Sequence, residues 1–183
     1  LIVTGILQMP VAKRYGITAI FPSTADFFTT LPWHYAFAVV FTFLCVFHLA
    51  VNAFEGHFDI VPQKGDFSKS IQIIKALFTG EPEPPSEKYL PEQRLAWACF
   101  VFAFALVIIT GWLKTLKNFS GIELPDPMLF WLAQLHNLGM ALTIVFFLGH
   151  MAAFIFKANR FLLPAMFSGY VDENYARHRH SLW

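Results

Sequence analysis

The sequence predicts an all-α integral membrane protein, and three observations lead to this fold class. First, 56% of the 183 residues are hydrophobic and only 14% are charged, whereas about a quarter of the residues in a soluble domain are charged. Second, three segments reach the roughly 20 apolar residues that a helix needs to cross a bilayer. Third, these segments contain no acidic residue. We therefore expect one membrane domain over residues 1–183, built as a helical bundle in contact with lipid.

The same composition excludes several other classes of protein. A chain this apolar is neither a disordered segment nor an ordinary soluble enzyme. The formal net charge of +1 gives no electrostatic basis for a nucleic-acid partner. The two cysteines lie inside apolar runs, so neither a disulfide framework nor a Cys-x-x-Cys metal site is expected. The sequence also shows no nucleophile–base arrangement and no glycine-rich phosphate loop, which argues against a hydrolase.

The expected spans follow one another along the chain. Residues 1–9 end at Pro10 and are too few to cross the membrane, so we expect the last turns of a helix whose start is absent. Full spans are expected over 33–54, 95–116 and 128–156, the last being long enough to tilt. The intact protein then has four transmembrane helices, the first of them truncated here.

The basic residues predict the orientation of these spans. Nine of the 13 Lys and Arg residues lie in the long loop 55–94 and in the tail 157–183, and four lie in the two opposite connections. The positive-inside rule places the long loop and the C-terminus in the cytoplasm, so spans 33–54 and 128–156 run parallel. Within the loop, apolar residues at helical spacing over 67–78 predict an amphipathic helix at the membrane interface.

Four histidines within the spans form the main candidate site. His34 and His48 lie in one span and His136 and His150 in another, and the members of each pair are 14 positions apart. Fourteen residues correspond to about 21 Å along a helix, and both side chains then lie within about 40° of the same face. Because the two spans are expected to run parallel, His34 can meet His136 near the outer face, and His48 can meet His150 near the inner face.

Two stacked bis-histidine sites predict a transmembrane pair of b-type haems. Ionisable residues inside a membrane usually mark a functional site, and neutral imidazole is a strong iron ligand. Two axial imidazoles leave a haem iron six-coordinate, which suits electron transfer. Gly139 follows His136 by three residues and is expected to leave room for a flat macrocycle to approach the backbone.

Other interpretations of these residues remain open. The histidines could form a proton or ion pathway, although such a pathway normally uses intramembrane acids, and non-haem metal sites also favour carboxylates. The chain could instead be a structural anchor for a partner enzyme. Arg94 and Lys157 at the cytoplasmic span ends could extend to the interface or pair with a haem propionate. The basic segment 177–180 is expected to be a solvated end, with propionates or anionic lipid headgroups as alternative partners.

Several short segments are informative through their order and spacing along the chain. They are Thr4–Ile6, Leu31–His34, Ile71–Gly80, Lys88–Tyr89, Glu92–Arg94, the helix with His136 and His150, and Arg177–Trp183. Together they resemble the cytochrome b (gamma) subunit of membrane-bound formate dehydrogenases and its hydrogenase relatives, over nearly the whole chain.

The resemblance implies a four-span, di-haem subunit in the bacterial cytoplasmic membrane. Electrons would come from an extracytoplasmic catalytic subunit through iron–sulfur clusters, and a quinone near the cytoplasmic face would accept them. His34 and His136 would hold the outer haem, and His150 would be one ligand of the inner haem. The residues expected near the quinone are Tyr89, Gln93 and Arg94.

The chain departs from this family at two positions. In the formate dehydrogenase subunits the second ligand of the inner haem is a histidine early in the first span, in a part that this chain lacks. His48 lies at the corresponding depth, and its pairing with His150 is similar to that in cytochrome b of the quinol–cytochrome c oxidoreductase complexes. We favour His48 as the ligand because it completes both sites. Leu90 stands where the family has an Asn in its quinone pocket.

Overall fold

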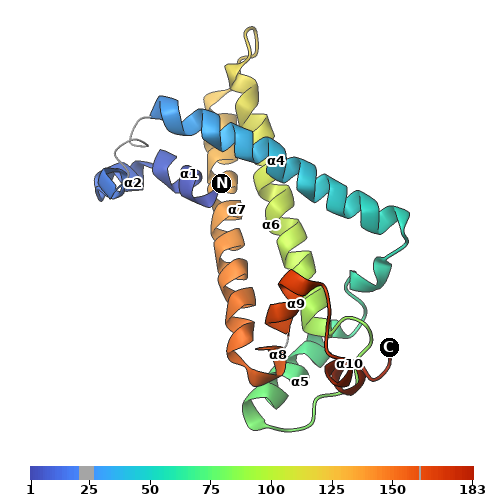
Figure 1. Ribbon diagram of the computed structural model, residues 1–183. Coiled ribbons are helices and arrows are strands. Elements are labelled where there is room, and N and C mark those ends of the chain that lie inside the picture. Colours follow the sequence, from blue (N-terminus) through green and yellow to red (C-terminus); the bar gives the residue numbers. More distant parts are fainter. Residues whose placement is uncertain (21–26, 161) are drawn as a thin grey trace. The chain divides into compact units, whose positions relative to one another are not determined.

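A computed structural model describes residues 1–20, 27–160 and 162–183, and all the regular structure in these ranges is helical (Figure 1). The chain forms two compact units, Leu1–Gly56 and His57–Trp183. The packing of both into one bundle over residues 1–183 stays a prediction.

Three helices are long and apolar enough to cross a membrane: Phe28–Phe54, Pro91–Asn118 and Asp126–Ile155. They confirm the predicted all-α integral membrane fold, and each overlaps one of the three predicted full spans. All three begin earlier than the sequence indicated, and a proline lies in the first turn of the helices that begin at Pro91 and Asp126. Backbone N–H groups in a first turn have no acceptor within the helix, so Pro91 and Pro127, which lack this group, cost no hydrogen bond there. Their fixed φ also suits a helix start. A fourth span stays a prediction.

The first unit contains α1 (Ile2–Gln8), α2 (Pro10–Arg14), α3 (Ile17–Ile20) and the long helix α4 (Phe27–Phe54). Pro10 separates α1 from α2, because proline removes a donor that a continuing helix needs and is favourable in a first turn. The short helix α1 packs against α4 within this unit. This contact brings a side chain of α1 to the predicted ligand His34.

The second unit is organised around two adjacent long helices, α6 (Pro91–Thr115) and α7 (Asp126–Ala152), which run side by side in Figure 1. The connection between them is short, so they form an antiparallel pair. The remaining elements of this unit are η2 (Phe58–Ile60), α5 (Asp66–Thr79), η3 (Leu116–Asn118), η4 (Ala153–Ile155), α8 (Lys157–Arg160), α9 (Leu162–Ser168) and α10 (Glu173–Arg179).

The predicted amphipathic helix in the long loop is present as α5. It lies between two glycines, Gly65 and Gly80, whose φ values of 93° and 74° place them in the left-handed region that glycine adopts at low cost. One face carries the buried residues and packs on α6. Another face carries the predicted apolar stripe of Phe67, Ile71, Ile74, Leu77 and Phe78, of which all but the half-buried Leu77 are exposed. Contact of this stripe with a membrane surface stays a prediction.

Candidate haem-binding site

His34 is held in the first unit by a threonine of the neighbouring helix. The Oγ1 atom of Thr4 in α1 lies 2.9 Å from Nδ1 of His34 in α4. The same hydroxyl donates to the carbonyl of Leu1 at 3.0 Å. His34 is half-buried, so its imidazole is oriented by a hydrogen bond between two helices.

His136 has an equivalent partner in the second unit. The Oγ1 atom of Thr110 in α6 lies 3.0 Å from Nδ1 of His136 in α7. This hydroxyl donates to the carbonyl of Leu106, one turn earlier in α6. Gly111 allows the close approach, because a Cβ atom there would lie 3.1 Å from Cε1 of the imidazole. His136 is half-buried, like His34.

The two remaining histidines of the spans have different surroundings. His48 is exposed in its unit, and the side-chain amide of Asn52 lies 3.4 Å from its Nδ1 and 3.5 Å from its Nε2. That amide donates more closely, at 2.8 Å, to the backbone carbonyl of His48. His150 is also exposed and lies edge-on to the rings of Phe100 and Phe154, at centroid distances of 6.0 and 6.1 Å.

Each histidine pair lies on one uninterrupted helix, His34 and His48 on α4 and His136 and His150 on α7. The 14-residue spacing therefore corresponds to about 21 Å along each axis. The two helices belong to different units. The pairing of His34 with His136, and of His48 with His150, stays a prediction.

The chemistry of these donors fits haem iron. A histidine whose Nδ1 is engaged with a threonine can bind a metal through Nε2, and ligating histidines commonly hold their other ring nitrogen in this way. A haem needs only two axial protein ligands. Among residues 1–20, 27–160 and 162–183, no group of three or more His, Cys, Asp or Glu side chains could hold a metal ion by itself.

Gly139 has a packing role that the sequence did not indicate. A Cβ atom there would lie 2.7 Å from Cγ1 and 3.2 Å from the backbone nitrogen of Val107 in α6. The absent side chain therefore allows α6 and α7 to approach closely, and the space beside it is filled by Val107 rather than left open for a macrocycle. Direct contact of Gly139 with a haem stays a prediction.

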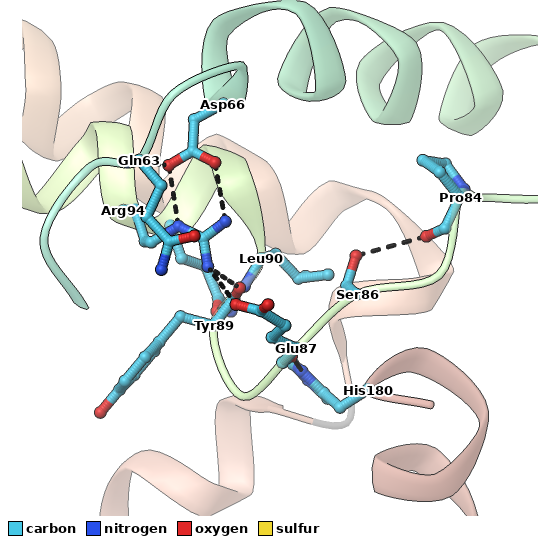
Figure 2. A network of polar contacts seen from close by, with 10 residues as sticks. Gln63, Asp66, Pro84, Ser86, Glu87, Tyr89, Leu90, Arg94 and His180 are labelled. Carbon is cyan, nitrogen blue, oxygen red and sulfur yellow. Dashed lines mark hydrogen bonds and ion pairs between the residues drawn. The ribbon is translucent and has the colours of Figure 1, made fainter. Parts of the chain in front are cut away.

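The Arg94 side chain does not extend to the membrane interface, and its guanidinium group is paired with a carboxylate of the chain itself. Its side chain is only 4% exposed, and it forms a two-pronged pair with Asp66 at 2.8 and 2.7 Å (Figure 2). It also donates to the carbonyl of Tyr89 at 3.0 Å and lies 3.5 Å from Glu87. The hydrogen bond from Arg94 is the main cause that holds the pKa of Asp66 below its usual range. Arg94 thus ties α5 to the start of α6.

The other two residues expected near a quinone lie beside this network. The Oε1 atom of Gln93 accepts from the backbone nitrogen of Leu90 at 3.0 Å and caps the first turn of α6. The ring of Tyr89 extends away from the Arg94–Asp66 pair in Figure 2 and lies 5.4 Å from the ammonium group of Lys88. Lys157 is exposed at the start of α8. Binding of quinone or haem propionate by these residues stays a prediction.

Half of the basic segment 177–180, which was expected to be a solvated end, is buried. Arg177 and His178 are exposed as expected, whereas Arg179 and His180 are 7% and 9% exposed. Arg179 pairs with Glu83 at 2.9 Å and donates to Asn159, while Nδ1 of His180 lies 2.8 Å from the carbonyl of Glu87. The prediction of a solvated end was therefore wrong for Arg179 and His180, because the segment before α6 offers them acceptors.

Sequence reasoning missed three residues that position this site. Thr4 and Thr110 support the histidines, and Asp66 neutralises Arg94. The sequence did contain a signal for Thr110, because it is a polar residue within the apolar run 95–116. In a helix its hydroxyl can donate to the carbonyl one turn earlier, that of Leu106. No spacing rule connects Thr4 to His34, because their contact depends on how α1 packs against α4.

Apolar helices that carry intramembrane histidines with oriented rings define a class of membrane proteins able to bind haem. The chain belongs to the prokaryotic cytochrome b561 family, whose model matches residues 1–169. It is therefore a membrane protein of a prokaryotic family whose members bind haem b and transfer electrons. Searches of curated proteins and of solved structures gave no match.

Proposed function

We propose that this chain is a di-haem b-type cytochrome subunit that carries electrons between an extracytoplasmic iron–sulfur partner and the quinone pool. The observation that carries the proposal is the arrangement of four histidines, in two pairs of equal spacing, on helices α4 and α7. Family membership over residues 1–169 supports haem b as the cofactor. The number of haems, the quinone and the partner belong to the proposal.

The ligands of the outer haem are His34 and His136, and those of the inner haem are His48 and His150. Equal spacing supports this assignment, because two parallel helices with the same 14-residue interval can match both pairs at once. Each haem supplies a one-electron iron couple when bound. The histidines would hold the haem iron, and the apolar helices would keep water and charge away from it.

The partner and the orientation follow from the charge distribution and from the likeness to formate dehydrogenase and hydrogenase subunits. The basic loop 55–94 and the tail 157–183 lie in the cytoplasm by the positive-inside rule. Electrons then enter at the outer haem from a catalytic subunit with iron–sulfur clusters and leave near the cytoplasmic face. Tyr89 is the first candidate for quinone contact, because Gln93 and Arg94 already serve as cap and anchor.

Alanine substitution of the four histidines tests the assignment. We expect His34→Ala and His136→Ala to lose the same haem, at about one haem per chain, and to abolish quinone reduction by the purified complex. His178→Ala is the matched control, since His178 is exposed on α10 outside the spans. A normal haem content in His136→Ala would contradict the proposal, and normal quinone reduction would indicate a structural anchor.

His48 is tested separately because the likeness to formate dehydrogenase subunits implies another inner ligand. The proposal predicts that His48→Ala and His150→Ala lose the same haem. The measurements are the haem content of each variant and the midpoint potential of the haem that it retains. Retention of both haems in His48→Ala, together with loss of one in His150→Ala, would contradict His48 as the ligand.

A further inference from the structure

We infer that Thr4 and Thr110 are positioning residues that fix the tautomer of two haem ligands, His34 and His136. The inference rests on the proposed function, because it concerns the same histidines. It adds a direction to their hydrogen bonds: Nδ1 of each imidazole carries the proton and Nε2 carries the lone pair that binds iron.

The direction follows from the hydrogen atoms available. A threonine hydroxyl has one hydrogen and two acceptor lone pairs. Thr4 gives its hydrogen to the carbonyl of Leu1, and Thr110 gives its hydrogen to the carbonyl of Leu106. Each hydroxyl therefore presents a lone pair to the imidazole, at 2.9 and 3.0 Å from Nδ1. With the hydroxyl hydrogen given to the carbonyl, the hydrogen bond to each imidazole forms when Nδ1 carries a proton and donates it.

The consequence concerns the other ring nitrogen. A neutral imidazole with its proton on Nδ1 has its lone pair on Nε2. Partners that accept from the distal N–H of a ligating histidine fix both its tautomer and its ring orientation, and they make it a more electron-rich ligand. The two threonines therefore prepare both rings for iron before the haem is bound.

The same arrangement occurs independently in the two units. Thr4 reaches His34 from α1 in the first compact unit, and Thr110 reaches His136 from α6 in the second. His48 and His150 differ, with an amide donor beside one ring and phenyl rings beside the other. The threonines consequently distinguish the outer ligand pair from the inner pair.

Valine substitution removes each hydroxyl while it preserves the shape of the side chain. In Thr4→Val and Thr110→Val, we expect one haem to transfer to excess apomyoglobin about 10 to 100 times faster, the usual range for loss of such a partner. The midpoint potential of that haem should rise, because the imidazole becomes a poorer electron donor. Thr4→Ser and Thr110→Ser should restore wild-type behaviour, since they retain the hydroxyl.

Thr143→Val is the matched control. Thr143 lies in α7, the helix that carries His136, and like Thr110 it donates to a carbonyl one turn earlier, that of Gly139, at 2.8 Å. Its substitution removes the same kind of hydroxyl from a long helix and should change neither haem transfer nor potential. Wild-type potentials and transfer rates in both Thr4→Val and Thr110→Val would overturn the inference.

A second measurement needs no substitution. In the dithionite-reduced wild-type protein, low-spin ferrous haem is diamagnetic, and nuclear magnetic resonance can detect the Nδ1 protons of the ligands. We expect these protons of His34 and His136 to show Overhauser contacts with Thr4 and Thr110. Absence of these contacts in a haem-loaded protein overturns the inference alone. Failure of the wild-type chain to bind haem overturns the proposed function instead.

Discussion

At the residue scale, the buried pair of Arg94 and Asp66 shows how a charge is accommodated at the end of a membrane helix. Both side chains are nearly inaccessible, at 4% and 2% exposed, and two short hydrogen bonds join them. A buried ion pair is not by itself a strong source of stability, but removal of one partner leaves an uncompensated charge. The pair is therefore best tested by breaking it on one side.

Asp66→Asn should destabilise the second unit by about 3–5 kcal/mol, because Arg94 then remains buried without its counter-charge. Thermal unfolding in detergent, followed by circular dichroism, measures the change. Arg177→Gln is the matched control, since Arg177 pairs with Glu173 at 2.7 Å on the exposed surface. Its effect should be only about 0.3–0.5 kcal/mol. Equal effects of the two substitutions would contradict the anchoring role of the buried pair.

The same pair predicts how stability depends on pH. The folded-state pKa of Asp66 is lowered, chiefly by the hydrogen bond from Arg94. The contribution of the pair is therefore present above the ordinary carboxyl pKa of about 3.9 and is lost as the pH falls through the lowered value. Unfolding measured at a series of acidic pH values should show this loss. Asp66→Asn should show a weaker dependence, and an unchanged profile would contradict the assignment.

At the element scale, the sequence predicted the helices better than the contacts between them. Apolar length alone located α4, α6 and α7, because a bilayer requires about 20 apolar residues. The contacts depend on shape, and hydropathy carries no information about shape. Gly139 illustrates this limit, because the sequence did not indicate that Val107 of α6 packs against this position.

Gly139→Leu should therefore separate α6 from α7. A side chain at this position meets Val107, including its backbone nitrogen, which cannot move independently of the helix. We expect a loss of about 1–3 kcal/mol from overpacking, measured as thermal stability in detergent. Gly149→Leu is the control, because a Cβ atom at Gly149 meets nothing within 4 Å in the same helix. Similar losses in both variants would contradict a specific packing role.

At the scale of the whole molecule, the tail shows what sequence reasoning could not supply. The basic run 177–180 resembles a solvated end, yet Arg179 and His180 are buried against the segment that precedes α6. More than 90 residues separate these partners, so no local pattern reveals them. The four span histidines were identified because helical periodicity is local. The threonine partners of His34 and His136 were missed because they lie on other helices.

The contact of the tail is testable by hydrogen exchange. The backbone N–H of Leu182 donates to the carbonyl of Ser86 at 3.1 Å, next to the ion pair of Arg179 with Glu83. Arg179→Gln should speed exchange of the Leu182 amide about tenfold or more, because a charge-assisted hydrogen bond is lost. Mass spectrometry of the C-terminal peptide measures this rate. An unchanged rate would show that Arg179 does not hold the tail.

The central claim is that one chain carries two b-type haems on four histidines. The most direct test is the haem content of the purified wild-type protein, with a reduced-minus-oxidised visible spectrum and a potentiometric titration. The account predicts a b-type band, about two haems per chain and two separable midpoint potentials. A b-type band with one haem and one potential would contradict the di-haem assignment, and no b-type band would contradict the account as a whole.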